Sequence, residues 1–273
     1  MRNMVADRAR DRESGYSQSL ERGLAVLSAF GTGRPLLGIS DLARELGLSR
    51  STTHRYVATL ASLRYLTQDP LTRKYRLGPR VLDLGFSAIN SMEIREISAP
   101  HLQALSDETG YTVNMGVLDG VDVLYVERSR SARQGQREID LNLHVGSRLP
   151  AYCTSLGKVL LAYLPAVEQR AAIARVELVR RGPNTITSRR ELARELERVR
   201  DAGLAVSNEE LAFGLRSIAA PVRAQTGDVV AAINLAVHRS MVSLEDLIAN
   251  LAPALQRTAA EISGHLGVGQ VRV

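Results

Sequence analysis

Apolar residues early in the chain recur at spacings of three and four, which predicts three short helices. The apolar stripe of the first helix comprises Leu20, Leu24, Leu27 and Phe30. The second helix is expected over residues 41–46 with Ser40 as its N-cap, and the third over residues 50–63 with Ser49 as its N-cap. Gly47 separates these two helices and permits a left-handed turn, so the region predicts a helix-turn-helix.

Two strand-like runs follow the third helix at residues 65–67 and 74–78, and Asp69-Pro70 predicts a turn between them. A hairpin placed after a helix-turn-helix indicates a winged helix-turn-helix. Pro79 can then open another helix at its first turn. The expected divisions of the chain are a disordered arm (1–15), a winged helix-turn-helix domain (16–78), a linker helix (79–95) and a second domain (96–265).

The second domain mixes helical and strand periodicities. Asp119-Gly120 between two apolar runs is a strong hairpin signal. Strands are predicted at 111–118, 121–128, 139–145, 204–207, 215–222 and 229–238, and helices at 100–109, 154–164, 188–201 and 243–264. Strands early and late in the sequence with helices between them predict an α+β fold around an antiparallel sheet.

The basic residues are concentrated at one end of the chain. Residues 1–80 contain 14 Lys and Arg against 7 Asp and Glu, a net charge of +7, whereas residues 81–273 contain 21 against 22, a net charge of −1. A basic small domain joined to a neutral larger one indicates a head that binds a polyanion and a body with another task.

The third helix has two contrasting faces at 100° per residue. The face expected to pack inward comprises Thr53, Val57, Leu60 and Ala61. The opposite face is short and polar with one arginine, and residues 50–68 include no acidic residue. Such a face suits the major groove of DNA, where carboxylates would be repelled. The predicted DNA contacts on this helix and on the wing are Ser49, Arg50, Ser51, Thr52, Arg55, Thr59, Arg73 and Lys74.

Two plainer interpretations stay open for these positions. The helix face could be an ordinary solvated surface, and the wing cations could serve solubility alone. His54 is expected to be a packed or partly exposed polar residue.

Little in the sequence favours catalysis or metal binding. Cys153 is the only cysteine, which excludes an intrachain disulfide and a multi-cysteine metal site. A buried role for it is favoured over a thiol catalyst paired with His144 or His238. Gly157-Lys158 lacks the flanking residues of a phosphate-binding loop. We therefore expect no enzyme activity, no catalytic residue, no cofactor and no metal.

The hydrophobic pattern also bears on cellular location. No apolar run reaches the roughly 20 residues that a membrane helix needs, and no secretory signal opens the sequence. A cytoplasmic protein without a membrane partner is expected.

Several motifs resemble those of the IclR family of transcriptional regulators. In the first domain they are residues 17–27 (SQSLERGLAVL) and 75–78 (YRLG). In the second they are residues 148–162 (RLPAYCTSLGKVLLA), 203–205 (GLA) and 214–222 (GLRSIAAPV). The resemblance spans residues 17–264 in the expected order. It implies a GAF-like effector-binding domain and a homodimer formed through the N-terminal domains, often paired further into a homotetramer.

The resemblance also implies a pocket for a small organic acid on one face of the sheet. The helix start near Thr154 would offer backbone N–H groups to a carboxylate. Arg148 could pair with a carboxylate or form a surface salt bridge, and Tyr152 could stack on an aromatic ligand or fill the core. The implied effector-binding residues are Arg148, Tyr152, Thr154, Ser155, Leu156, Ser207, Ser217 and Asn234. A basic run is interpreted as a solvated loop, with an acid-attracting flap as the alternative; it comprises Arg128, Arg130, Arg133 and Arg137.

The expected function is a DNA-binding transcriptional regulator that responds to a small organic acid. Residues 124–128 and 151–155 are similar to the subgroup that controls aromatic-acid breakdown through protocatechuate and β-ketoadipate. The expected partners are a double-stranded DNA operator, the acid and further copies of the chain. The alternatives are a regulator of another small-acid pathway, such as glyoxylate or pyruvate, and a DNA-binding protein that needs no ligand.

Overall fold

A computed structural model of the protein describes residues 15–31, 33–130 and 143–266. The chain divides into two compact units, Met1–Ala88 and Ile89–Val273, and each is described by itself. The division falls within helix α5 (Arg80–Asn90), which begins directly after Pro79.

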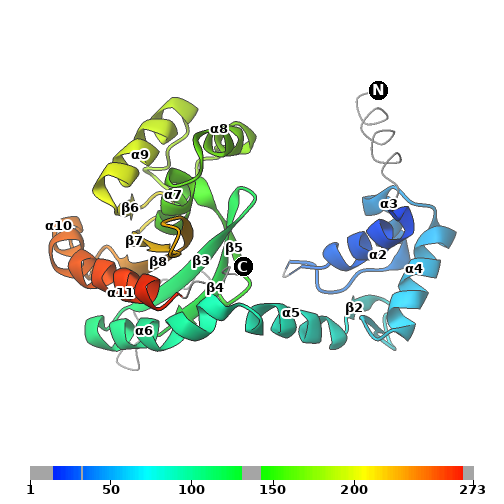
Figure 1. The fold of residues 1–273 in the computed structure, drawn as a ribbon. Helices are drawn as coiled ribbons and strands as arrows, with labels where there is room; N and C mark the ends of the chain where they lie inside the picture. Colours follow the sequence, from blue (N-terminus) through cyan, green and yellow to red (C-terminus); the bar gives the residue numbers. More distant parts are fainter. Residues whose placement is uncertain (1–14, 32, 131–142, 267–273) are drawn as a thin grey trace. The chain divides into compact units, whose positions relative to one another are not determined.

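Unit 1 contains the elements of a winged helix-turn-helix (Figure 1). Before α5 they are α2 (Gln18–Ser28), α3 (Ile39–Leu46), α4 (Arg50–Ser62), β1 (Leu66–Gln68) and β2 (Tyr75–Leu77). The two strands pair antiparallel, with Thr67 opposite Arg76. The order that the hydrophobic pattern predicts is therefore confirmed for this unit.

Local side-chain chemistry determines where the helices of unit 1 begin. The hydroxyl of Ser49 accepts a hydrogen bond from the N–H of Thr52 at 3.1 Å, as predicted for an N-cap. The prediction for Ser40 is wrong, because α3 begins two residues earlier, at Ile39, with Gly38 as its N-cap. The carboxylate of Asp41 accepts from the N–H of Gly38 at 3.1 Å, which stabilises the earlier start.

The core of unit 1 is small. Its buried members are Val26, Phe30, Leu37, Leu42, Val57, Leu66 and Tyr75. The three leucines of the predicted stripe on α2 are not among them, because Leu20 and Leu24 are exposed and Leu27 is only partly buried. Unit 1 thus leaves part of its amphipathic first helix uncovered.

Unit 2 is built on a six-stranded antiparallel sheet with the order β5-β4-β3-β8-β7-β6. The strands are β3 (Thr112–Asp119), β4 (Asp122–Ser129), β5 (Arg148–Pro150), β6 (Ala205–Asn208), β7 (Leu215–Arg223) and β8 (Val229–His238). The predicted hairpin at Asp119-Gly120 joins β3 to β4. The first and last thirds of the unit meet where β3 pairs with β8.

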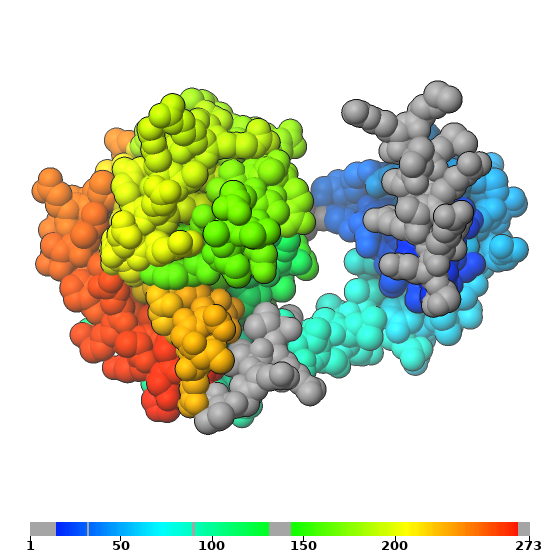
Figure 2. Space-filling view, turned by 45° about the horizontal axis from the view of Figure 1, so that its top comes forward, coloured from blue at the N-terminus to red at the C-terminus, as the bar shows by residue number. Residues whose placement is uncertain are grey.

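Helices cover both faces of this sheet, so unit 2 has three layers (Figure 1). One face carries α6 (Glu93–Thr109) and α11 (Ala252–His265). The other carries α7 (Ser155–Ala162), with α8 (Ala166–Arg175) and α9 (Arg189–Ala202) packed outside it. In Figure 2 the green and yellow-green segments of these last helices form one continuous surface. The remaining turns are η1 (Ala151–Cys153), α10 (Leu244–Asp246) and the π-helical η2 (Leu247–Leu251).

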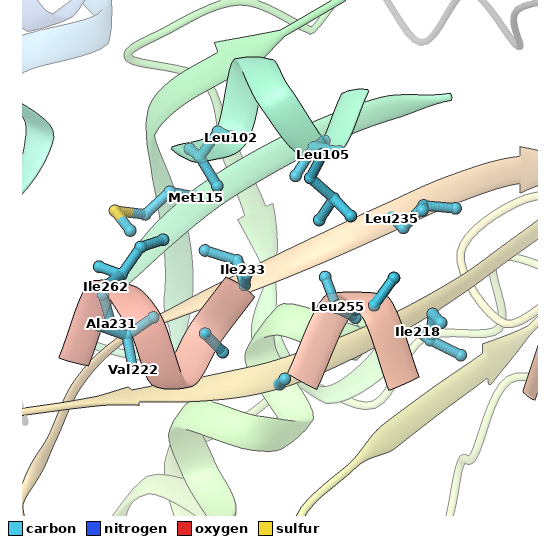
Figure 3. Close-up of a cluster of buried hydrophobic side chains, with 14 of the residues drawn as sticks. Leu102, Leu105, Met115, Ile218, Val222, Ala231, Ile233, Leu235, Leu255 and Ile262 are labelled. Carbon is cyan, nitrogen blue, oxygen red and sulfur yellow. The ribbon is translucent and has the colours of Figure 1, made fainter. Parts of the chain in front are cut away.

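Strand alternation separates two cores in unit 2. Figure 3 shows the first, in which Leu102 and Leu105 of α6 and Leu255 of α11 point at the sheet residues Met115 and Ile233. The residues between these strand positions point to the opposite face, toward α7. Gly157 lets α7 pack closely against the backbone of Ala151, because a Cβ at position 157 would lie 2.2 Å from that backbone.

Three predictions for unit 2 need correction. Helix α6 starts at Glu93 and runs through Pro100, because Ile94 is buried in the sheet core before the proline. The strand predicted at 139–145 lies partly outside the described residues, and positions 143–145 are not strand. Strand β5 and helix α8 have no predicted counterpart.

Candidate functional sites

Helix α4 presents a polar surface that matches the predicted DNA contacts. Arg50, Ser51 and Arg55 are exposed, whereas Thr53 and Val57 are buried in the unit 1 core. Three of the predicted contacts also stabilise the helix itself. The hydroxyl of Ser49 donates to Thr52 Oγ1 at 2.8 Å, and the hydroxyl of Thr59 donates to the carbonyl of Arg55 at 2.9 Å.

The wing lies beside the start of α4 and forms a groove with it. Arg73 and Lys74 are exposed at the tip of the hairpin. The groove is lined by Arg50 and His54 of α4 and by the two wing residues, with Asp41 at the start of α3 as its one carboxylate among the described residues. His54 is thus exposed and faces this groove. Together α4 and the wing form a cationic surface suited to a nucleic-acid backbone.

A cavity of about 650 Å³, its mouth included, lies in unit 2 on the sheet face that α7 covers. The start of α7 forms one side, the ends of β7 and β8 a second, and β3 and β4 the third. Its lining comprises Tyr111, Thr112, Asn114, Tyr125, Arg128, Leu143, Cys153, Thr154, Ser207, Leu211, Leu215, Ser217, Asn234, Ala236, Val237, His238 and Met241.

A chain of hydrogen bonds crosses the sheet at the base of the cavity. Arg128 Nη1 donates to Asn114 Oδ1 at 3.0 Å, and Asn114 Nδ2 donates to Asn234 Oδ1 at 2.8 Å. Asn234 Nδ2 contacts Ser155 Oγ at 3.5 Å, and the hydroxyls of Ser155 and Ser217 are 2.8 Å apart. Strand register explains the chain, since Asn114 lies opposite both Asn234 and Arg128.

The cavity has a cationic character. Arg128 is one of its lining residues, and no lining residue in the described part of the chain is a carboxylate. Burial raises the pKa of Tyr125, so its phenol stays protonated and can donate a hydrogen bond. Burial also raises the pKa of Cys153 to about 11, which keeps the thiol protonated at neutral pH. An organic anion suits this environment.

The loop after β6 closes one side of the cavity with Leu211. A buried lysine anchors this loop, because Lys158 Nζ contacts Glu210 at 2.6 Å, Glu195 at 2.9 Å and the carbonyl of Val206. Burial raises the pKa of Glu210, and the ammonium of Lys158 opposes that rise.

The preceding residue fixes the other end of the same loop. Glu209 has a left-handed backbone with φ of 56°. Its carboxylate accepts from the N–H of Gly214 at 2.7 Å and contacts Arg239 at 3.0 Å. The Gly214 hydrogen bond is the main cause that lowers the pKa of Glu209. The loop is therefore anchored at two neighbouring carboxylates.

The implied effector residues fall into two groups. Four of them line the cavity: Thr154, Ser207, Ser217 and Asn234. Ser155 is fully buried and meets the cavity through its contact with Ser217.

The other three lie outside the lining. Arg148 pairs with Asp119 at 2.8 Å with both side chains about half exposed. The hydroxyl of Tyr152 donates to the carbonyl of Val179 at 2.6 Å, and Leu156 is buried in the core under α7.

No group of three or more His, Cys, Asp or Glu with metal-binding geometry occurs within residues 15–31, 33–130 and 143–266. Over the same residues, no helix is long and apolar enough to cross a membrane.

Comparison with known proteins places the two units in one family. Residues 86–264 match the family described as Bacterial transcriptional regulator IclR C-terminal, and residues 19–70 match the IclR helix-turn-helix domain. The chain belongs to the IclR family. It is an IclR-type transcriptional regulator, with the winged helix-turn-helix as its DNA-binding domain.

Relatives of this IclR regulator include two with described roles. The chain is 35% identical to the Pca regulon regulatory protein of Pseudomonas putida, over 92% of this chain and 84% of that protein. It is also 35% identical to the p-hydroxybenzoate hydroxylase transcriptional activator of Acinetobacter baylyi, over 92% of each. A solved IclR homologue from Microbacterium hydrocarbonoxydans, complexed with 4-hydroxybenzoate, is 26% identical with a TM-score of 0.76, and the match covers 91% of this chain and 99% of that one.

Sequence analysis of this IclR regulator did not predict several of the cavity's polar residues. Arg128 ends the predicted strand 121–128 and opens the basic run interpreted as a solvated loop; it lies on β4, at the base of the cavity. Arg133 and Arg137 of the same basic run lie outside the described residues. Asn114 lies in a mostly apolar strand and is not among the predicted site residues. A single amide in a buried strand is itself a signal of a polar network.

Proposed function

We propose that the cavity of unit 2 binds an aromatic carboxylate, and that this ligand controls transcription of genes for aromatic-acid catabolism. The single observation that carries the proposal is Arg128 at the base of a cavity without a lining carboxylate among the described residues. A guanidinium can pair with a carboxylate through two parallel hydrogen bonds. Asn114 orients that guanidinium from below at 3.0 Å.

The remaining lining suits a ring with polar substituents. Tyr111 and Tyr125 provide aromatic surface, and Leu211 provides apolar surface. Ser207 and Ser217 place hydroxyls on the side opposite Arg128, where they can hydrogen-bond a phenol. The names of the Pseudomonas and Acinetobacter relatives and the 4-hydroxybenzoate bound to the Microbacterium homologue favour the same ligand class.

Within this proposal, Thr154, Ser207, Ser217 and Asn234 are effector contacts, and Ser155 orients Ser217. The carboxylate partner is Arg128 in place of Arg148. Arg148 already pairs with Asp119 outside the cavity. Tyr152 and Leu156 support the helix start from the core.

We also propose that the regulator is a cytoplasmic homodimer that binds a double-stranded operator. Five large apolar side chains of unit 1 are more than half exposed on α2 and α5: Leu20, Leu24, Leu82, Leu84 and Phe86. A second copy of the chain would cover these faces, since water disfavours such apolar surface. Pairing of dimers into a tetramer is a further step of the same proposal.

Thermal stability with and without candidate acids tests the ligand class. A ligand that binds only the native state raises the melting temperature, and at a fixed concentration a tighter ligand raises it more. We expect a rise with 4-hydroxybenzoate or protocatechuate, and a smaller one or none with β-ketoadipate, glyoxylate or pyruvate. A rise with glyoxylate or pyruvate alone would contradict the aromatic ligand and indicate that the cavity binds a small aliphatic acid.

Two variants then test the cavity residues. Arg128→Met should weaken binding of the aromatic acid by about 10- to 150-fold, as measured by calorimetric titration. This is the range for the loss of a hydrogen bond to a charged group. Arg130→Met is the matched control, because that exposed arginine is not a lining residue. Ser217→Leu should fill the cavity and abolish the ligand response, with Ser217→Ala as the milder variant. Unchanged affinity in Arg128→Met and Ser217→Leu would refute this binding site.

A further inference from the structure

The tip of the wing carries the most exposed large apolar side chain of the described residues. Leu71 is 92% exposed, and the next such residue, Phe213, is 72% exposed. A single exposed leucine is ordinary in a flexible loop. The turn around Leu71 is instead tightly hydrogen-bonded, which sets this residue apart.

One carboxylate organises that turn. Asp69 Oδ1 accepts from the N–H of Leu71 at 3.1 Å, from the N–H of Thr72 at 2.7 Å and from the hydroxyl of Thr72 at 2.8 Å. At the neck, the N–H of Asp69 donates to the carbonyl of Lys74 at 2.8 Å. Arg73 adopts a left-handed backbone with φ of 57°. The chain therefore presents Leu71 outward on an ordered support.

The groove beside the wing indicates which side of a duplex the tip would meet. Arg50 and His54 of α4 line one wall, and Arg73 and Lys74 of the wing line the other. If α4 enters the major groove, this groove, in which Arg50, Arg73 and Lys74 outnumber the single carboxylate of its described lining, Asp41, can take the adjoining sugar–phosphate strand. That strand separates the major groove from the minor groove. The wing tip, beyond the strand, then lies at the minor groove.

We propose that Leu71 is an apolar wedge that enters the minor groove of the operator and unstacks a base step. The inference rests on the DNA-binding function proposed above. Apolar side chains, leucine among them, act in this way in proteins that kink DNA. Arg73 and Lys74 follow the wedge in the chain and contact the phosphates of the strand beside it.

Charge argues for a duplex as the occupant in preference to a second copy of the chain. Residues 1–80 have a net charge of +7, and Arg73 and Lys74 follow Leu71 by two and three residues, against one carboxylate, Asp69, two residues before it. Two such tips would repel each other, whereas a polyanion attracts both cations.

The experiment uses the full chain and a duplex selected by it from a random DNA library. 2-Aminopurine is placed in turn at each position of the selected site, because its fluorescence rises when a base step unstacks. We expect a rise at one step with the wild-type chain and with Leu71→Met. Leu71→Ala should lose the rise and bind the site about tenfold more weakly, since the buried apolar surface shrinks.

Val167→Ala is the matched control, since Val167 is 70% exposed in unit 2. It should retain both the fluorescence rise and the affinity. If Leu71→Ala and the wild type bind the selected site with equal affinity and give the same rise in fluorescence, the wedge proposal is wrong and the proposed function stands. A change in the sedimentation of the free protein with Leu71→Ala would assign the residue to self-association instead. Failure to select any site would overturn the proposed function, and the wedge with it.

Discussion

The two units use their polar residues in opposite ways. Unit 1 has a core of seven buried hydrophobic residues and places its candidate contacts on the outside, on α4 and the wing. Unit 2 has two cores, one on each face of its sheet, and places its polar chain inside, from Arg128 to Ser217. A surface that must match a long polyanion needs exposed cations. A site for a small molecule needs enclosed groups whose hydrogen bonds are fixed before the ligand arrives.

This difference determines how each unit tolerates change. In unit 1, a substitution on the outer face of α4 alters binding and leaves the core intact. In unit 2, the polar residues are part of the interior, so a substitution that leaves one group without its partner alters folding as well.

The buried Lys158 should be the most sensitive charged residue of unit 2. Lys158→Met leaves the carboxylates of Glu195 and Glu210 without their common cation. We expect a loss of about 3–5 kcal/mol in the free energy of unfolding, measured by urea denaturation, as for other broken buried ion pairs. Arg198→Ala is the matched control, since Arg198 contacts the same Glu195 at 2.7 Å with a side chain 73% exposed. It should cost about 0–1 kcal/mol. Equal losses in the two variants would contradict a special role for burial.

Unit 1 should show the opposite behaviour, with binding altered and stability unchanged. Arg55→Ala on the outer face of α4 should lose about 1–3 kcal/mol of binding to a selected site and much less to random DNA. Arg73→Ala on the wing should weaken binding to both duplexes similarly, because phosphate contacts carry no sequence information. Fluorescence anisotropy at fixed salt measures both. Equal losses on the two duplexes for Arg55→Ala would remove that residue from base recognition.

The contrast also explains how far each unit could be predicted from sequence. The signals that shape unit 1 are local, because each acts on residues close to it in the chain. They include the N-cap Ser49, the turn residue Gly47 and the Asp69-Pro70 turn. The helices and the wing could therefore be predicted in the right order. The exposure of Leu20 and Leu24 could not be foreseen, because an apolar stripe does not say whether its own chain or another covers it.

In unit 2 the strands and the hairpin at Asp119-Gly120 were predictable from alternation. The cavity was not, since its residues come from five strands, from the start of α7 and from loops, and meet only in the fold. Arg128 lies next to a basic run in the sequence, and Tyr152 and Leu156 lie next to Thr154. Only the fold shows that Arg128 and Thr154 line the cavity while their neighbours in the sequence do not.

The smallest expected effect concerns Asp69, which is ordered without burial. The hydrogen bonds from the backbone and hydroxyl of Thr72 hold the pKa of Asp69 below its usual value. The folded state therefore favours the ionised carboxylate. This contribution to stability is present above the unfolded-state pKa and is lost as the pH falls through the lower folded-state value. The turn should thus stay ordered at neutral pH and loosen only in acid.

An NMR titration of the Asp69 carboxyl carbon measures this directly. Thr72→Val removes the hydroxyl donor but keeps the N–H, so the pKa of Asp69 should rise part of the way toward its usual value. Thr226→Val is the control, because its hydroxyl contacts Asp228 in unit 2 at 2.8 Å. A normal pKa for Asp69 in the wild-type chain would mean that the turn is loose in solution. Leu71 would then lack the ordered support that distinguishes it from any other exposed leucine.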